Sequence, residues 1–244
     1  MTIDKKYIDQ FIKVTSKAAL ASSYLTGKKN KIAADKAAVD SMRLELNKMD
    51  IKGKIVIGEG ELDEAPMLYI GEDVGNQKGP EFDIAVDPLE GTNFAANNLP
   101  GALSVLAVAE KKNLFNAPET YMEKISTKAK EKNVVDLDYS VKKNISNLSE
   151  YLNKKPENLT ACILDRPRHN KIINELRDLN VNIKLITDGD VCGALLVTDE
   201  KYNVDIFLGT GGGPEGVIAA TALDAFECGF QGRFLFKTDE DKRR

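Results

Sequence analysis

The run VDIFLGTGGGPEGVIAATALDAF, residues 204–226, carries three successive patterns that indicate the fold class. VDIFLG (204–209) is a short apolar run typical of a buried strand, and GTGGGPEG (209–216) is a glycine-rich loop. The apolar segment from Pro214 to about Phe226 predicts a helix, because proline is favoured in the first helical turn. A strand, a glycine loop and a helix in this order are typical of an α/β protein.

The residues before this run repeat the same alternation. TACILD (160–165) predicts a strand followed by a helix over 167–179, and NIKLIT (182–187) predicts a strand followed by a helix from about Asp190. Alternating strands and helices imply parallel strands joined by crossover helices. We therefore predict an α/β fold for this part of the chain.

The first half of the chain predicts two helices and then strands. Apolar residues at three-and-four spacing mark both helices, and short β-branched runs mark the strands. The predicted helices cover 5–25 and 31–49, and the predicted strands cover 54–58, 82–86 and 102–110. Lysines alternate with small and acidic residues over 124–133, which we interpret as an exposed connection. We therefore predict one domain over 1–125 and a second over 126–244.

Composition narrows the classes of function. The 244 residues are 42% hydrophobic and 30% charged with a formal net charge of −4, so nothing global favours nucleic acid or an anionic membrane as partner. The three cysteines are widely spaced without a CxxC pair, which argues against disulfides and a thiolate zinc site. Neither a signal peptide nor a membrane-spanning run is recognisable, so we predict a cytoplasmic protein.

Two acidic clusters follow predicted strands. GEGELDEAP (58–66) places several acidic residues close together, and their like charges must be offset by a cation, by shared protons or by hydration. Taken alone, such a cluster is more often a solvated turn. DPLEGT (87–92) places Asp87 and Glu90 on a stiff turn at the carboxyl end of a strand, where open α/β sheets bind ligands. These two carboxylates suit a divalent cation, and the alternative is a strand-to-helix connection with Thr92 as helix cap.

The glycine loop at 209–216 adds a possible phosphate cradle. Successive backbone N–H groups at a helix start bind phosphate, and Glu215 beside a phosphate makes sense if a metal ion lies between them. An acidic residue in a first helical turn is also explained without a ligand, because the helix dipole stabilises its negative charge. Arg166 and Arg168 in DRPRH (165–169) suit phosphate binding, or are surface cations, whereas His169 is expected to be structural.

Several of these stretches resemble the motifs of one known family. VIGEGELDEAPMLYIGEDVG (56–75), DIAVDPLEGT (83–92), NAPETYMEK (116–124), RPRH (166–169), DGD (188–190) and GTGGGPEGV (209–217) are similar to motifs of the class II fructose-1,6-bisphosphatases, the GlpX family. DPLEGT is also similar to a signature of the wider lithium-sensitive phosphatase superfamily. The resemblance implies a layered αβαβα sandwich of the sugar-phosphatase type.

The resemblance also implies a set of site residues and two or more manganese or magnesium ions. One ion would be held by Asp35 and Glu59, and a second by Asp87, Glu90 and Glu215. Thr92 would orient or deprotonate the attacking water, with Glu61 and Asp63 relaying the proton. The implied substrate contacts are Glu90, Gly91, Thr92, Tyr121, Arg166, Pro167, Arg168, Asp188, Gly189, Asp190 and Gly212.

The implied reaction is hydrolysis of the 1-phosphate of fructose 1,6-bisphosphate in gluconeogenesis, by a homo-oligomer that is a dimer or a tetramer. Two alternatives are a broader sugar-bisphosphate phosphatase, acting also on sedoheptulose 1,7-bisphosphate, and a non-catalytic sugar-phosphate-binding remnant. Family members continue past the segment that matches GRFLF (232–236), whereas this sequence ends at KTDEDKRR (237–244). We therefore expect the second α/β part to be truncated relative to the family.

Overall fold

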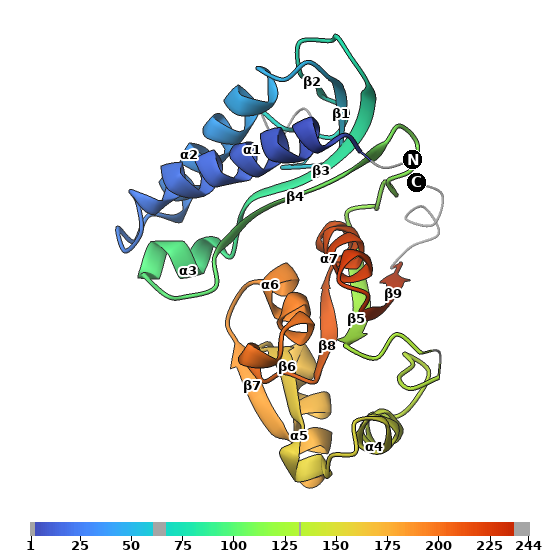
Figure 1. The fold of residues 1–244 in the computed structure, drawn as a ribbon. Coiled ribbons are helices and arrows are strands. Elements are labelled where there is room, and N and C mark those ends of the chain that lie inside the picture. The colour runs from blue at the N-terminus through green and yellow to red at the C-terminus, as the bar shows by residue number, and fades with distance from the viewer. Residues whose placement is uncertain (1–2, 61–66, 132, 237–244) are drawn as a thin grey trace. The chain divides into compact units, whose positions relative to one another are not determined.

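The computed structural model describes residues 3–60, 67–131 and 133–236, which form two compact units. The first unit is Met1–Ala117 and the second is Pro118–Arg244. Each unit packs helices on a mixed sheet, so the predicted α/β class is confirmed (Figure 1). The five-layer order αβαβα concerns both units together and stays a prediction.

The first unit places α1 (Lys5–Ser23) and α2 (Lys31–Leu46) on one face of a sheet with strand order β2-β1-β3-β4 (Figure 1). The strands are β1 (Lys52–Ile57), β2 (Asp73–Val74), β3 (Glu81–Glu90) and β4 (Leu103–Glu110), and the short helix α3 (Thr92–Asn97) follows β3. β1 and β3 are parallel, whereas β2 and β4 run antiparallel to their neighbours. The core lies between the helices and β1 and β3, with Met42, Ile55 and Ile84 fully buried.

The second unit contains a sheet with strand order β7-β6-β8-β5-β9. Its strands are β5 (Tyr121–Thr127), β6 (Thr160–Leu164), β7 (Asn182–Ile186), β8 (Ile206–Gly212) and β9 (Gly229–Leu235). Its α-helices are α4 (Val141–Tyr151), α5 (Asn170–Asp178), α6 (Asp190–Leu195) and α7 (Gly213–Ala225). Helices α4 and α5 contribute to one core, formed with Ile125, Ile163 and Leu208, while α6 and α7 lie over the opposite face (Figure 1).

Three features differ from the sequence-based expectation. The strands β6, β7 and β8 are parallel as predicted, but β5 runs antiparallel to β8 and to β9, so the sheet is mixed. The expected exposed connection at 124–133 is wrong for 124–127, because these residues form most of β5 and are buried between two neighbouring strands. The helix α4 was not predicted.

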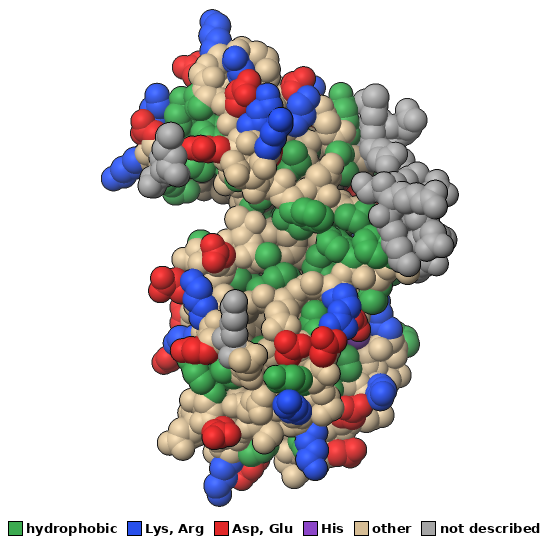
Figure 2. Space-filling model, turned by 90° about the vertical axis from the view of Figure 1, so that its right-hand side faces the viewer, with side chains coloured by type: hydrophobic (Ala, Val, Ile, Leu, Met, Phe, Trp, Pro, Cys, Tyr) green, Lys and Arg blue, Asp and Glu red, His purple; other side chains and the backbone are tan. Residues whose placement is uncertain are grey.

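Within the described part of the chain, no helix is both long and apolar enough to cross a lipid bilayer. On the face that Figure 2 presents, acidic and basic side chains are interspersed rather than gathered into one basic patch. The three cysteines are free thiols.

Candidate active site

In the first unit, two carboxylates approach each other where β1 ends. Glu59 lies two residues beyond β1, and Asp35 projects from the first half of α2. Burial, together with the nearby charge of Asp35, raises the pKa of Glu59 from its ordinary value of 4.5 to about 7. Burial also raises the pKa of Asp35. A partly buried carboxylate whose charge is disfavoured by a second carboxylate nearby forms a site that a cation would stabilise.

The second acidic motif contains a bulge at the end of β3. Asp87 pairs with Val105 and Glu90 with Leu103, so β3 has one extra residue between them, and Pro88 lies in this bulge. The Asp87 Oδ1 accepts a hydrogen bond from the Leu89 amide at 3.1 Å, and the Glu90 side chain is buried.

Gly91 turns the chain from β3 into α3. Its φ of 75° lies in the left-handed region, and an added Cβ would come within 2.8 Å of the Phe94 ring. Thr92 is then the first residue of α3 rather than its cap. The alternative interpretation of Thr92 as a helix cap is therefore wrong, because Gly91 occupies the cap position.

The parallel pairing of β1 and β3 brings these motifs to one sheet edge. Ile57 of β1 pairs with Ala85 of β3, and both strands then continue toward acidic residues. Glu59 and Asp87 each lie two residues beyond this pair. The carboxyl edge of the sheet in the first unit therefore carries both acidic motifs, as the rule for open α/β sheets requires.

In the second unit, the arginine, DGD and glycine-loop motifs also meet at one sheet edge. They follow the carboxyl ends of the parallel strands β6, β7 and β8. Tyr121 joins them because antiparallel β5 begins at this edge, where Tyr121 pairs with Gly212. The sequence motifs predicted from separate parts of the chain are thus brought together within this unit.

Arg168 is held by the glycine loop. Its Nε and Nη2 donate to the Thr210 carbonyl at 2.9 and 2.8 Å, and its guanidinium lies 5.1 Å from the centre of the Tyr121 ring. Buried His169 accepts from the Thr210 amide at 2.8 Å and contacts the Leu164 carbonyl through Nδ1, and its burial lowers its pKa. His169 is therefore a structural residue, and Thr210 is an anchor that sequence reasoning missed.

The end of the glycine loop has no room for side chains. A Cβ on Gly211 would overlap the Asp190 carboxylate, and one on Gly212 would overlap the Glu215 carboxylate. Gly212 caps α7, and Glu215 lies in the first turn of that helix. The loop thus brings its backbone close to two acids that the sequence marked as site residues.

Lys124 is a second residue that sequence reasoning missed. It lies in the middle of β5 with 1% of its side chain exposed, and its Nζ forms an ion pair with Asp190 Oδ2. The alternation of YMEKIST (121–127) was available as a signal, because it places Met122, Lys124 and Ser126 on one face of a strand.

The donor set suits a hard cation, although the described residues do not complete a metal site. Carboxylate oxygens are the ligands that Mg²⁺ and Mn²⁺ prefer. Among residues 3–60, 67–131 and 133–236, no three His, Cys, Asp or Glu side chains are grouped closely enough to surround an ion. The predicted acids Glu61 and Asp63 lie outside the described residues. The pair Asp35 and Glu59 is thus the fragment of a cation site that the geometry supports.

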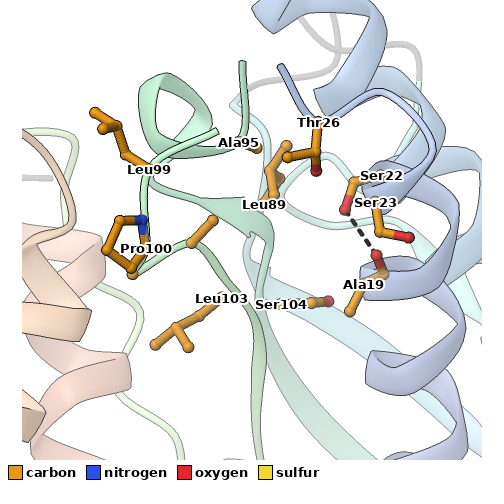
Figure 3. Close-up of a pocket in the computed structure, with 12 residues that line it drawn as sticks. Ala19, Ser22, Ser23, Thr26, Leu89, Ala95, Leu99, Pro100, Leu103 and Ser104 are labelled. Carbon is orange, nitrogen blue, oxygen red and sulfur yellow. Dashed lines mark hydrogen bonds between the residues drawn. The ribbon is translucent and has the colours of Figure 1, made fainter. Parts of the chain in front are cut away.

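A pocket of about 290 Å³ in the first unit is distinct from these residues. It lies between the end of α1, α3 and the start of β4, and Figure 3 shows its lining of small aliphatic and hydroxyl side chains. Ser22, Thr26 and Ser104 supply hydroxyls, and the lining has no charged side chain. It therefore lacks the acids for a divalent cation and the cations for a phosphate.

Comparisons with known proteins show the family to which the chain belongs. A family model described as bacterial fructose-1,6-bisphosphatase, glpX-encoded, matches residues 5–244. The chain belongs to this family. A D-fructose 1,6-bisphosphatase class 2/sedoheptulose 1,7-bisphosphatase of Prochlorococcus marinus (strain AS9601) is 44% identical over 234 residues, which are 96% of this chain and 70% of that protein. The protein of the same name from Synechococcus sp. (strain CC9311) gives the same identity and coverage.

The predicted site residues of this fructose-1,6-bisphosphatase family member are divided between the two units. The first unit contributes Asp35, Glu59, Asp87, Glu90, Gly91 and Thr92. The second contributes Tyr121, Arg166, Pro167, Arg168, Asp188, Gly189, Asp190, Gly212 and Glu215. The individual roles of these residues stay predictions.

Proposed function

We propose that this chain hydrolyses the 1-phosphate of fructose 1,6-bisphosphate, releasing fructose 6-phosphate and phosphate. The observation that carries the proposal is the opposed carboxylate pair of Asp35 and Glu59 at the carboxyl edge that also carries the Asp87–Thr92 turn. Such a pair is unfavourable in an empty site and favourable around a divalent cation. Family membership supports the choice of a sugar bisphosphate as substrate.

Manganese or magnesium, with two or more ions in the site, is the cofactor we propose. Asp35 and Glu59 would hold one ion, and Asp87, Glu90 and Glu215 would hold another. When bound, the ions offset negative charge on the phosphoryl oxygens and lower the pKa of a bound water. The buried Glu90 and the bulge before it support a fixed position for Asp87 and Glu90 within the first unit.

Thr92 is the residue we propose to orient the attacking water. Thr92 is the first residue of α3 and follows directly on the left-handed Gly91. The water oxygen bonds to phosphorus as the bond from phosphorus to the C1 oxygen breaks. The proton lost by water then reaches the leaving C1 oxygen, and Glu61 and Asp63 are the predicted relay.

The second unit supplies the proposed substrate contacts. Arg168 and Arg166 offer cations, the glycine loop offers backbone amides, and Tyr121, Asp188 and Asp190 offer hydrogen-bonding groups beside them. Cations and amides suit phosphate, whereas carboxylates suit sugar hydroxyls.

The test is phosphate release from fructose 1,6-bisphosphate by the purified chain, with the metal removed by chelation and then restored as manganese. We expect release only with the metal, and a loss of at least about 100-fold in Glu59→Gln and in Thr92→Ala. Glu150→Gln on the exposed side of α4 is the matched control and should behave as the unmodified chain. Equal rates in all four proteins would contradict the proposal.

Sedoheptulose 1,7-bisphosphate is a second candidate substrate, because both relatives carry this activity in their names. Initial rates with the two bisphosphates separate a dual enzyme from a single one. Tight product binding without turnover at saturating manganese would instead indicate a non-catalytic sugar-phosphate-binding protein. We also propose a homo-oligomer, a dimer or a tetramer, located in the cytoplasm.

A further inference from the structure

Glu72 is a buried acidic residue that the proposed mechanism does not use. Its side chain is 5% exposed, and it lies directly before β2. Its Oε1 accepts a hydrogen bond from Arg43 Nε at 2.5 Å, and its Oε2 accepts one from the backbone N–H of Leu68. Removing a carboxylate from water is costly, and a hydrophobic side chain at this position would avoid that cost. The two donors therefore indicate what this charge holds in place.

Leu68 has a backbone conformation that leucine rarely adopts. Its φ of 55° lies in the left-handed region, where a Cβ crowds the following carbonyl oxygen. Such a conformation persists only where the surrounding structure fixes it. One fixing contact is the Leu68 side chain, which is fully buried in the core of the first unit. The other is the Glu72 carboxylate, which accepts from the Leu68 N–H.

The backbone of Leu68 in turn fixes the segment that carries Glu59. The Leu68 carbonyl accepts from the Glu59 N–H at 3.0 Å. Next to this bond, the Gly60 carbonyl accepts from the Ile70 N–H at 2.9 Å. The contact is close, because a Cβ on Gly58 would lie 1.9 Å from the Leu68 carbonyl oxygen. A change in the orientation of the backbone at Leu68 would therefore move Glu59.

The helix α2 contacts this arrangement at two points. It carries Asp35 in its first half and Arg43 in its last turn, about two helical turns apart. Asp35 is near enough to Glu59 for its charge to act on that carboxylate, and Arg43 holds Glu72. The same helix thus supplies one acid of the proposed cation site and the anchor for the backbone on which the other acid depends.

We propose that Glu72 is a positioning residue for the cation site. Its carboxylate, oriented by Arg43, fixes the backbone of Leu68. The hydrogen bond between Leu68 and Glu59 then sets where the Glu59 carboxylate meets a divalent cation together with Asp35. Glu72 acts through the backbone, in the way that groups behind metal ligands orient them. This inference rests on the proposed function, since it takes Asp35 and Glu59 as ligands of a cation.

The test measures binding of Mn²⁺ alone to the purified metal-free chain, through the electron paramagnetic resonance signal of the free ion. In Glu72→Met the Leu68 N–H loses its acceptor, so we expect the Mn²⁺ Kd to rise about 10-fold. Glu72→Gln and Arg43→Met each keep an acceptor for this N–H but lack the ion pair, so we expect a rise of about 3-fold in both. A rise in Glu72→Gln as large as that in Glu72→Met would overturn the proposal.

A variant of Glu59 shows whether Glu72 acts through this ligand. In the Glu59→Gln background, Glu72→Met should cause no further rise in the Mn²⁺ Kd, because the ligand that Glu72 positions is already altered. A further rise of about 10-fold overturns the proposal. If Glu72→Met does not fold, Glu72→Gln and Arg43→Met decide the question, and an unchanged Kd in both overturns the proposal.

Glu45→Met is the matched control. Glu45 is another shielded carboxylate of the first unit, with 10% of its side chain exposed, and it pairs with Lys13 and Lys48. We expect this variant to lower the free energy of unfolding and to leave the Mn²⁺ Kd unchanged. A purely structural role of Glu72 predicts the same result for Glu72→Met, so lower stability with an unchanged Kd in that variant overturns the proposal.

Failure of this inference is distinguishable from failure of the proposed function. A Mn²⁺ Kd that depends on Glu72, without phosphate release by the unmodified chain, would reject the function and support the positioning role. Phosphate release by the unmodified chain, with an unchanged Mn²⁺ Kd in Glu72→Met, would reject the positioning role and leave the function intact. Absence of Mn²⁺ binding by the unmodified chain would overturn the inference.

Discussion

Replacing Glu59 by glutamine should stabilise the metal-free protein at neutral and alkaline pH. The pKa of Glu59 is raised from 4.5 to about 7, mainly by burial and then by the charge of Asp35. A rise of this size corresponds to about 3 kcal/mol of unfavourable interaction for the ionised carboxylate in the fold. Glutamine has nearly the same shape without the charge, so it removes this cost.

The sign of the pH dependence follows from the direction of the shift. Between pH 4.5 and about 7 the folded protein binds more protons at Glu59 than the unfolded chain does, so this residue makes stability fall as pH rises through that window. The cost is fully present above pH 7 and absent well below pH 4.5. Asp35, whose pKa is also raised, contributes in the same direction.

The assay is denaturant unfolding of the unmodified chain and Glu59→Gln, with chelator present, from pH 4 to pH 8.5. We expect the two proteins to have equal free energies of unfolding at pH 4 and to diverge to about 3 kcal/mol in favour of Glu59→Gln at pH 8. Adding manganese should then stabilise the unmodified chain more than the variant. Equal stability of the two metal-free proteins at pH 8 would refute the raised pKa of Glu59.

Other perturbations test the remaining local geometry. Gly91→Ala should lower the free energy of unfolding by about 2 kcal/mol or more, from the left-handed backbone and the contact with Phe94; unchanged denaturant midpoints would contradict this. His169→Ala should cost about 3 kcal/mol, because it leaves a cavity and removes the hydrogen bond to the Thr210 amide, and thermal unfolding measures it. Gly211→Ala should weaken fructose 6-phosphate binding at least about 10-fold by calorimetry, and binding within two-fold of the unmodified chain would count against the role of the glycine loop.

Local sequence patterns were sufficient to predict most helices and strands, and to predict the sheet edges at which the motifs lie. The strands β6, β7 and β8 were predicted to be parallel, and the carboxyl ends of parallel neighbours coincide by geometry alone. The same rule explains why Glu59 and Asp87 share an edge in the first unit. Sequence reasoning therefore located the motifs well within each unit.

Local sequence patterns could not predict which residues or strands pair when they are distant in the sequence. Lys124 has a charge that is typical of an exposed residue, and its partner Asp190 is distant in sequence. The strand alternation around Lys124 therefore does not indicate which residue pairs with it. The direction of β5 depends on its neighbours β8 and β9 rather than on its own residues. Helix α4 buries only Asn144, Ile145 and Leu148, which leaves a narrow apolar stripe in a polar segment.

The arginine pair shows how the structure changes the roles that a motif predicts. A guanidinium binds phosphate bidentately through its Nε and Nη2 edge or through its two Nη groups. In Arg168 the Nε and Nη2 edge is occupied by the Thr210 carbonyl, so only the Nη1 side is left for a ligand. Arg166 commits one Nη1 bond to the Asp165 carbonyl at 2.9 Å, which leaves its Nε and Nη2 edge for a phosphate. Arg168 therefore serves mainly to fix the glycine loop, and Arg166 is the better candidate for bidentate phosphate binding.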